Sequence, residues 1–219
     1  IEDKTSYKIV ETNKKTYTCK GIILALGRKP RSFDNKNVSL LEGKGVSYCS
    51  LCDGPLFKNQ DVSIIGGGNS ALEEALYLAD ICKSVTIINR RDVLRGDKIL
   101  VDKVLKKDNI NILYNSEVVE FNKKDDFLES LTIKTNGKLN KLEVKACFIF
   151  IGYVPATDFL SNLDILDEKG YIKTDKNLKT DIPFIYACGD TINKQVYQIV
   201  TATGEGAVSA ISFINDYNS

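Results

Sequence analysis

The sequence predicts an α/β protein in which a parallel sheet carries an appended antiparallel meander. Short apolar strands at 61–65, 84–88 and 110–113 alternate with two helix-like segments, the pattern of a parallel βαβαβ unit. Three strand-like segments follow, with the hairpin signal Asn136-Gly137 between the last two. A composition of 43% apolar and 27% charged residues in 219 is that of an ordinary globular chain, with room for one large or two small domains.

The first sixty residues contain a predicted hairpin followed by a predicted linker. Strand-like segments at 7–10 and 16–19 flank the turn residues 13–15, and a buried type of strand follows at 21–26. The polar stretch 28–45 is typical of a loop or linker.

The remaining elements follow from hydrophobic periodicity. Apolar residues at 72, 75, 76 and 79 recur at helical spacing, and a basic helix-like segment covers 99–105. Segments at 117–121, 128–134 and 142–147 predict the meander, and a strand at 147–151 ends at Gly152. An apolar segment at 184–188 leads into Gly189-Asp190, and 200–214 predicts a helix.

Charge and composition exclude several classes of protein. Thirty basic and 29 acidic residues leave a net charge of +1, so nothing indicates nucleic acid or an anionic membrane as a partner. The longest apolar runs are about seven residues, whereas a membrane-spanning helix needs about 20. The lack of histidine excludes a histidine base and a histidine-containing zinc site, and we expect no metal. We expect a cytoplasmic protein because no signal pattern is present, and a processed chain or a fragment because methionine is absent.

A glycine-rich turn follows the strand at 61–65 and opens a helix. Its pattern is Gly66-x-Gly68-x-x-Ala71, with Asn69 and Ser70 between. In a dinucleotide fingerprint the first glycine makes the tight turn, the second admits the pyrophosphate, and a small third residue lets helix and strand pack closely. The strand before it and the helix after it favour dinucleotide binding over an ordinary glycine-rich turn.

The end of the next strand suggests which nucleotide is bound. NAD-binding proteins often place an acidic residue there for the ribose 2′-hydroxyl, whereas this chain has Arg90 and Arg91, with Arg95 one turn later. Guanidinium groups bind a 2′-phosphate through bidentate, charge-assisted hydrogen bonds. The arrangement favours NADPH; the alternative is a solvated basic turn.

The pair Cys49 and Cys52 has the spacing of a reducible disulfide, and Asp53 beside it is placed to exchange a proton. Half of a zinc site or two structural thiols are the alternatives, and zinc lacks further ligands. Gly189-Asp190 at a strand end is a weaker signal, since a carboxylate there binds nucleotide hydroxyls but glycine-aspartate is also a common turn.

Together these segments resemble the low-molecular-weight, bacterial type of thioredoxin reductase, a flavoprotein family. The resemblance covers nearly the whole chain in order. The matching segments are 45–54, 66–71 with 73–78, Arg90-Arg91-Asp92 with Arg95, 151–155, 187–190 and 198–207.

The resemblance implies two domains: a Rossmann-like NADPH domain at 33–154, inserted into an FAD domain formed by 1–32 and 155–219. In this family electrons pass from NADPH through FAD to the disulfide and then to thioredoxin. By resemblance Cys52 faces the flavin, Cys49 attacks thioredoxin, and Asp53 is the general acid.

The resemblance also implies further cofactor contacts. Asp190, next to Gly189, would bind the ribityl chain of FAD, and Gln198, Ile199 and Val200 would face the flavin ring. Ile151 and Gly152 join the nucleotide-binding set.

Three departures from the family stand out. Asn89 replaces the usual histidine before the two arginines, and Tyr197 replaces the usual arginine before Gln198. The chain also has one glycine fingerprint where the family has two, so its FAD site is expected to be incomplete. By that comparison the segment holding the first fingerprint is missing.

The leading prediction is therefore NADPH-dependent reduction of thioredoxin, in a parent enzyme expected to be a homodimer. One alternative is the flavoprotein component of a peroxiredoxin reductase. The other is an NADP-binding module without turnover.

Overall fold

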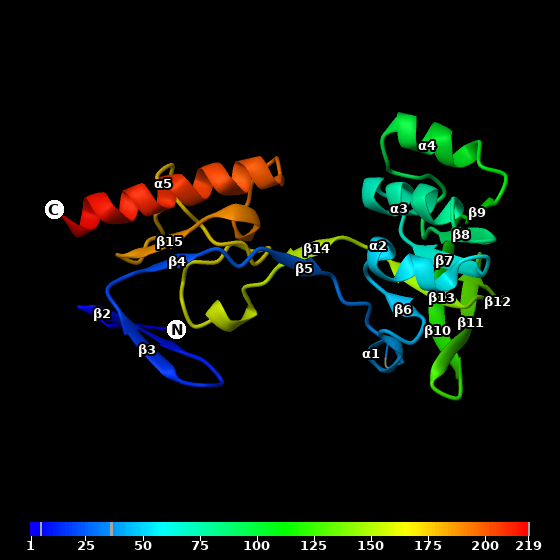
Figure 1. Ribbon diagram of the computed structural model, residues 1–219, viewed down its shortest axis with the longest axis horizontal. Helices are drawn as coiled ribbons and strands as arrows, with labels where there is room; N and C mark the ends of the chain where they lie inside the picture. The colour runs from blue at the N-terminus through cyan, green and yellow to red at the C-terminus, as the bar shows by residue number, and fades with distance from the viewer. Residues whose placement is uncertain (5, 36, 219) are drawn as a thin grey trace. The chain divides into compact units, whose positions relative to one another are not determined.

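The computed structural model describes residues 1–4, 6–35 and 37–218. The chain divides into two compact units: unit 1 is Ile1–Lys29 with Tyr153–Ser219, and unit 2 is Pro30–Gly152. The passages between the units lie at the paired strands β5 (Arg28–Pro30) and β14 (Tyr153–Pro155) (Figure 1).

Unit 2 is built on a five-stranded parallel sheet with the order β6-β13-β7-β8-β9. Its inner strands are mostly apolar and almost entirely buried, as expected for strands covered on both faces. The strands are β6 (Val46–Ser47), β7 (Asp61–Ile65), β8 (Ser84–Ile88), β9 (Ile110–Leu113) and β13 (Ala146–Ile149).

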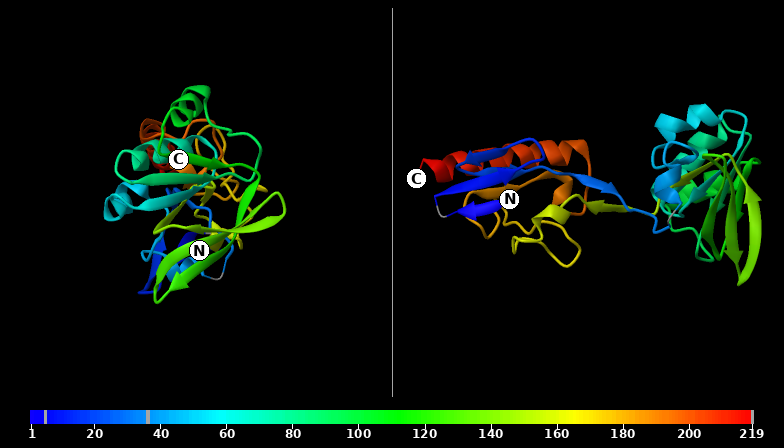
Figure 2. Two further views of the ribbon diagram at one scale, coloured as in Figure 1. Left: turned by 90° about the vertical axis from the view of Figure 1, so that its right-hand side faces the viewer. Right: turned by 90° about the horizontal axis from the view of Figure 1, so that it is seen from below.

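Helices cover one face of this sheet and a meander covers the other. Val62 and Ile64 of β7 pack in a core with α3 (Asn69–Ala79) and α4 (Lys98–Leu105), whereas Ile65 packs in a second core with residues of the meander (Figure 2). Successive side chains of a strand point to opposite faces, so one short strand serves both cores.

The meander consists of β10 (Ser116–Lys124), β11 (Phe127–Thr135) and β12 (Lys138–Glu143), all antiparallel. Asn136 and Gly137 have φ values of 48° and 84°, the left-handed conformations that a two-residue hairpin requires. The single strand predicted at 142–147 is wrong. The backbone changes partner at Lys145, whose N–H donates to Asp61 O at 2.9 Å, so the segment ends β12 and begins β13 in the parallel sheet.

Unit 1 combines a small antiparallel sheet with a parallel strand pair and a long helix. The antiparallel sheet contains β1 (Glu2–Lys4), β2 (Tyr7–Glu11) and β3 (Thr16–Cys19). Strand β4 (Ile22–Leu24) pairs in parallel with β15 (Ile185–Ala187), and α5 (Ile199–Tyr217) runs along that pair (Figure 2).

Short elements escaped prediction. The stretch predicted as a loop at 28–45 contains β5 and α1 (Val38–Leu41), because Val38 and Leu41 are buried in the second core of unit 2. Helix α2 (Ser50–Asp53) and the 3-10 turns at Gly54–Phe57, Asp158–Leu160 and Gly189–Thr191 complete the structure. Among the described residues, no helix is both long and apolar enough to cross a membrane.

Candidate functional site

Cys49 and Cys52 form a disulfide bond at the start of helix α2. Their Cα atoms are 5.4 Å apart, a separation that one helical turn provides. Cys49 is the N-cap residue of α2, and its Sγ accepts a hydrogen bond from the backbone N–H of Cys52 at 3.2 Å. Ser47 Oγ accepts from the N–H of Cys49 at 3.0 Å, so the backbone on both sides of the disulfide is fixed.

The disulfide is accessible from one side and supported from the other. Cys52 is exposed and Asp53 is half-buried, with the Asp53 N–H donating to Cys49 O at 3.2 Å. A Cβ added at Gly54 would approach Leu78 Cδ2 to 2.9 Å, so a larger residue here would force the Leu78 side chain to shift where the chain after α2 lies against α3. Packing against α3 would therefore hold both thiols of the reduced pair in place, while Cys52 remains accessible to solvent.

The predicted fingerprint forms the turn from β7 to α3. Gly66 has a φ of 143°, and a Cβ there would lie 2.3 Å from the carbonyl oxygen of Phe150. Gly68 is the N-cap of α3 and faces open space, since a Cβ at this position would meet no atom within 4 Å. Ala71 is fully buried. The turn thus exposes the first backbone N–H groups of an eleven-residue helix, which is the arrangement that binds phosphate.

Asn69 and Ser70 behave differently within this turn. The Asn69 side chain accepts from the N–H of Asp97 at 2.7 Å and donates to its carboxylate at 2.9 Å, which fixes the loop before α4. Ser70 is exposed at the first turn of α3. Ile151 and Gly152 follow β13, the strand beside β7, so they lie near the glycine turn at the carboxyl ends of the parallel strands.

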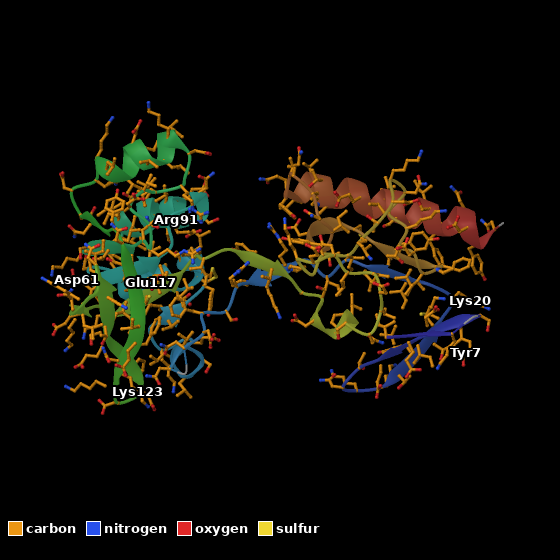
Figure 3. The ribbon with its side chains drawn as sticks, turned by 180° about the vertical axis from the view of Figure 1, so that it is seen from behind. Tyr7, Lys20, Asp61, Arg91, Glu117 and Lys123 are labelled. Carbon is orange, nitrogen blue, oxygen red and sulfur yellow. A yellow bond between two sulfur atoms is a disulfide. The ribbon has the colours of Figure 1, made fainter. Side chains whose placement is uncertain are left out.

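The three predicted phosphate-binding arginines lie together beyond β8. Arg90, Arg91 and Arg95 are exposed, and within the described residues none of their guanidinium groups makes a hydrogen bond or ion pair (Arg91 is labelled in Figure 3). The Arg95 N–H donates to Gly67 O at 2.7 Å, which joins the arginine loop to the glycine turn. Free guanidinium groups beside a glycine turn fit a nucleotide that carries a 2′-phosphate.

Asn89 has a structural part in this loop. It is buried, and its side-chain amide donates to the carbonyl oxygens of Arg91 and Val93, both at 3.0 Å. The departure at this position therefore shapes the arginine loop from within.

The predicted flavin-contacting residues lie in unit 1, where they take part in an ionic cluster. Asp190 pairs with Arg28 at 3.4 Å and with Lys194 at 3.7 Å. Lys194 also contacts Glu205 at 2.8 Å, and Glu205 accepts from the N–H of Gly189 at 2.8 Å. The cluster ties the turn after β15 to the first half of α5.

Gln198 is the N-cap of α5 and forms a capping box with Thr201. Ile199 and Val200, which begin the helix, are 86% and 77% exposed. Tyr197 stands under the guanidinium of Arg28, whose central carbon is 3.7 Å from the ring centroid, a cation–π contact. The structure therefore groups the disulfide, the glycine turn and the arginines in unit 2, and the residues 189–200 in unit 1.

A family model described as pyridine nucleotide-disulphide oxidoreductase matches residues 1–206. The chain belongs to the pyridine nucleotide-disulphide oxidoreductase family. Within this family it is similar to the thioredoxin reductase of Listeria monocytogenes, with 39% identity over 211 residues. That match covers 95% of this chain and 66% of the relative, so the chain spans less than two thirds of that relative's length.

Solved structures of the same family have the same fold. The thioredoxin reductase of Lactococcus lactis superimposes with a TM-score of 0.89 at 38% identity, covering 98% of this chain and 72% of that one. The thioredoxin reductase of T. acidophilum gives a TM-score of 0.86 at 34% identity, covering all of this chain and 72% of that one. The predicted α/β fold class and the resemblance to bacterial-type thioredoxin reductases are confirmed for this chain.

Sequence reasoning missed two groups near the candidate site. Arg28 falls in the predicted linker, and its contact with Asp190 depends on tertiary structure alone. Glu74 lies on α3 with one carboxylate oxygen buried, and burial raises the pKa of this carboxyl. A signal for Glu74 existed: it lies three residues after buried Ala71 and four before buried Leu78, positions that share a helix face.

Proposed function

We propose that this chain carries the NADPH-binding and disulfide-exchanging parts of a thioredoxin reductase. The observation that carries the proposal is the bonded Cys49–Cys52 pair in the same compact unit as the glycine turn and the unpaired arginines. In this proposal unit 2 is the NADPH domain and unit 1 contributes to an FAD domain. The similarity to thioredoxin reductases supports thioredoxin as the substrate.

The residues of unit 2 fit NADPH. The N–H groups at the start of α3 would bind the pyrophosphate, and Gly68 leaves room for its approach. Arg90, Arg91 and Arg95 would hold the 2′-phosphate, since their guanidinium groups have no other partner among the described residues. When bound, NADPH would supply a hydride, and a flavin would carry its two electrons toward the disulfide.

The residues of unit 1 fit only part of an FAD site. Asp190 and the N-terminus of α5 offer a carboxylate for hydroxyl groups and a partial positive charge for a reduced ring. The described part of unit 1 has no glycine-rich strand-to-helix turn for a pyrophosphate. We therefore expect this chain to bind FAD less tightly than a complete FAD site would.

The reduced cysteines exchange with the substrate in two displacement steps. The Cys49 thiolate attacks one sulfur of the thioredoxin disulfide, which forms a mixed disulfide and releases one thioredoxin thiolate. Asp53 is placed to deliver a proton to that thiolate. The Cys52 thiolate then attacks the Cys49 sulfur, which restores the Cys49–Cys52 disulfide and releases the second thioredoxin sulfur as a thiolate that takes a proton from water.

The test measures nucleotide and flavin separately on this chain. The purified protein is mixed with FAD, freed of unbound flavin, and titrated anaerobically with NADPH while the visible spectrum is recorded. Bound flavin that bleaches would support a working half-reaction. NADPH binding without retained flavin would limit the chain to the nucleotide and disulfide parts, and absence of NADPH binding would contradict the proposal.

A variant separates disulfide exchange from nucleotide binding. In the parent enzyme, Cys49→Ser should abolish reduction of thioredoxin while NADPH still reduces the flavin. Surviving thioredoxin reduction would show that Cys49 is not the attacking thiol.

The unpaired arginines favour thioredoxin reductase over the peroxiredoxin reductase flavoprotein. An NADP-binding module without turnover would bind NADPH but show no role for the two cysteines. A homodimer and a cytoplasmic location stay predictions.

A further inference from the structure

Helix α3 turns one carboxyl group toward the core of unit 2. Glu74 lies between Ala71 and Leu78, which are both fully buried on the inner face of the helix. Its Oε2 atom is shielded from solvent and has no hydrogen-bond partner within the described residues. Buried polar atoms in folded proteins are nearly always paired, so an unpaired carboxylate oxygen calls for an explanation.

A second unpaired polar atom lies on the neighbouring helix α2. Ser50 stands between the two cysteines of the disulfide, is 1% exposed, and has an Oγ atom with no hydrogen-bond partner among the described residues. Helix α2 packs against α3, and the close approach of Gly54 to Leu78 keeps the two helices together. The Ser50 hydroxyl lowers the pKa of Glu74, so the hydroxyl and the carboxyl are neighbours across this contact.

The surroundings favour the neutral form of this carboxyl. Burial raises the pKa of Glu74 most, the Ser50 hydroxyl lowers it, and the like charge of Glu73 on the same helix raises it further. Glu73 is the one charged group among the causes of this shift. The charged groups on the elements that pack against α3 are not among them; they are Asp53 on α2, Asp61 on β7, and Lys98, Asp102 and Lys103 on α4. Within the part of the chain that the structure describes, Glu74 forms no ion pair with a cation.

We propose that Glu74 is a positioning residue for the redox disulfide: through Ser50, its protonation state controls the fraction of the reduced Cys49–Cys52 pair that is thiolate. The inference rests on the proposed function, because it concerns the reduced pair. Protonated Glu74 donates a hydrogen bond to Ser50 Oγ and adds no charge. Ionised Glu74 accepts from Ser50 instead and places a negative charge beside the helix that bears the thiolate, which disfavours thiolate formation.

Ser50 connects Glu74 to the cysteine pair, so the effect of the Glu74 charge on thiolate formation should be large enough to measure. Ser50 directly follows Cys49, and neighbouring Cα atoms are about 3.8 Å apart. Two like charges roughly 8–10 Å apart, in a protein of effective dielectric near 20, shift an ionisation equilibrium by about 15- to 30-fold, and salt screening reduces this effect severalfold. Loss of the charge from Glu74 should therefore raise the thiolate fraction by about three- to tenfold at a pH where the wild-type carboxyl is ionised.

The experiment measures thiol reactivity against pH. The full chain is reduced with dithiothreitol, freed of reductant, and pulsed with iodoacetamide between pH 5 and 8. Mass spectrometry then gives the alkylation rates of Cys49 and Cys52 separately from the four other cysteines. The ratio of the Glu74→Gln rate to the wild-type rate should be near one at pH 5 and rise to about three- to tenfold by pH 8.

Two further variants identify Ser50 as the link and control for charge. Removal of the hydroxyl that lowers the pKa of Glu74 should raise that pKa. The ratio of the Ser50→Ala/Glu74→Gln rate to the Ser50→Ala rate should therefore rise at a higher pH than the corresponding ratio in the wild-type background. Asp80→Asn removes an exposed carboxylate at the end of the same helix, where it pairs with Lys107, and should leave both rates within about twofold of wild type.

The outcomes distinguish the inference from the function on which it rests. A ratio that stays constant with pH, or one that Asp80→Asn reproduces, would overturn the role of Glu74 while the redox pair stands. Failure of dithiothreitol to generate thiols at Cys49 and Cys52 would overturn both. If Glu74→Gln does not fold, an unchanged pH profile in Ser50→Ala alone contradicts the inference.

Discussion

The two units solve the problem of burying apolar surface differently. In unit 2, a parallel sheet is covered on both faces, and its central strand residues Val62, Ile64 and Phe148 are fully buried. In unit 1, two parallel strands share a smaller core, and α5 leaves apolar side chains such as Val200 and Ile211 mostly exposed. The comparison indicates that the nucleotide and disulfide chemistry rests on the unit with the closed core, where positions are fixed by packing on both sides.

The largest expected effect is on the stability of unit 2. Phe148→Ala removes a fully buried ring that packs edge-on against Phe57, and should destabilise unit 2 by about 3–5 kcal/mol. The matched change in unit 1, Ile211→Ala on the exposed face of α5, should change stability by less than about 0.5 kcal/mol. Urea unfolding followed by hydrogen exchange measures each unit separately. Equal losses would contradict the contrast between a closed and an open core.

The next effect separates two glycines of the fingerprint. Gly66→Ala places a Cβ 2.3 Å from Phe150 O at a positive φ, so it should lower the melting temperature and weaken NADPH binding by about a hundredfold. Gly68→Ala meets nothing within 4 Å, so it should leave the melting temperature unchanged and weaken NADPH binding alone. Calorimetry and a binding titration test both variants. Destabilisation by Gly68→Ala would show that this position is constrained by the fold and not by the ligand.

A smaller effect concerns the choice of nucleotide. Arg90→Ala and Arg91→Ala should each weaken NADPH binding by about tenfold and NADH binding by less than about twofold, because only NADPH carries the 2′-phosphate. Lys83→Ala serves as the control, since Lys83 is an exposed cation already paired with Asp61. Equal losses for NADPH and NADH would contradict the role of the arginines in recognising phosphate.

Local sequence predicted the parts of the fold that depend on short-range pattern. The strands β7 and β8, helix α3 and the turn Asn136-Gly137 follow from apolar runs, helical spacing and turn chemistry. The break between β12 and β13 was missed because residues 142–146 alternate apolar and charged side chains as a single strand does, and only the bond from Lys145 to Asp61 shows where the partner changes.

The same limit applies to the candidate site. The glycine turn and the arginines are close in sequence to the elements that present them, and their assigned roles stay predictions. The contacts of Arg28 with Tyr197 and of Ser50 with Glu74 join residues distant in sequence, so no local pattern indicates them. Those contacts depend on how helices pack, which a single sequence does not state.

The smallest expected effect comes from comparing one carboxyl group in each unit, Asp216 in unit 1 and Glu74 in unit 2. In unit 1, the Lys179 ammonium and then the Tyr186 hydroxyl, each 2.6 Å away, lower the pKa of Asp216. A lowered folded-state pKa contributes stability above the unfolded-state value, and that stability is lost as pH falls through the folded-state pKa. Asp216→Asn should therefore lower the stability of unit 1 at neutral pH. The stability of this variant should then change little as the pH falls.

In unit 2, the pKa of Glu74 is raised, so its shift is opposite in sign to the shift of Asp216. Its contribution is fully present below the unfolded-state pKa and is lost as pH rises through the folded-state pKa. The stability of each unit is measured by thermal melting between pH 3 and 7, followed by hydrogen exchange. The stability of Asp216→Asn should be closest to that of the wild type at the acid end. The stability of Glu74→Gln should increase relative to the wild type toward neutral pH. Shifts of the same sign for both variants would mean that the two carboxyl groups share one environment, because only opposite surroundings move their pKa values in opposite directions.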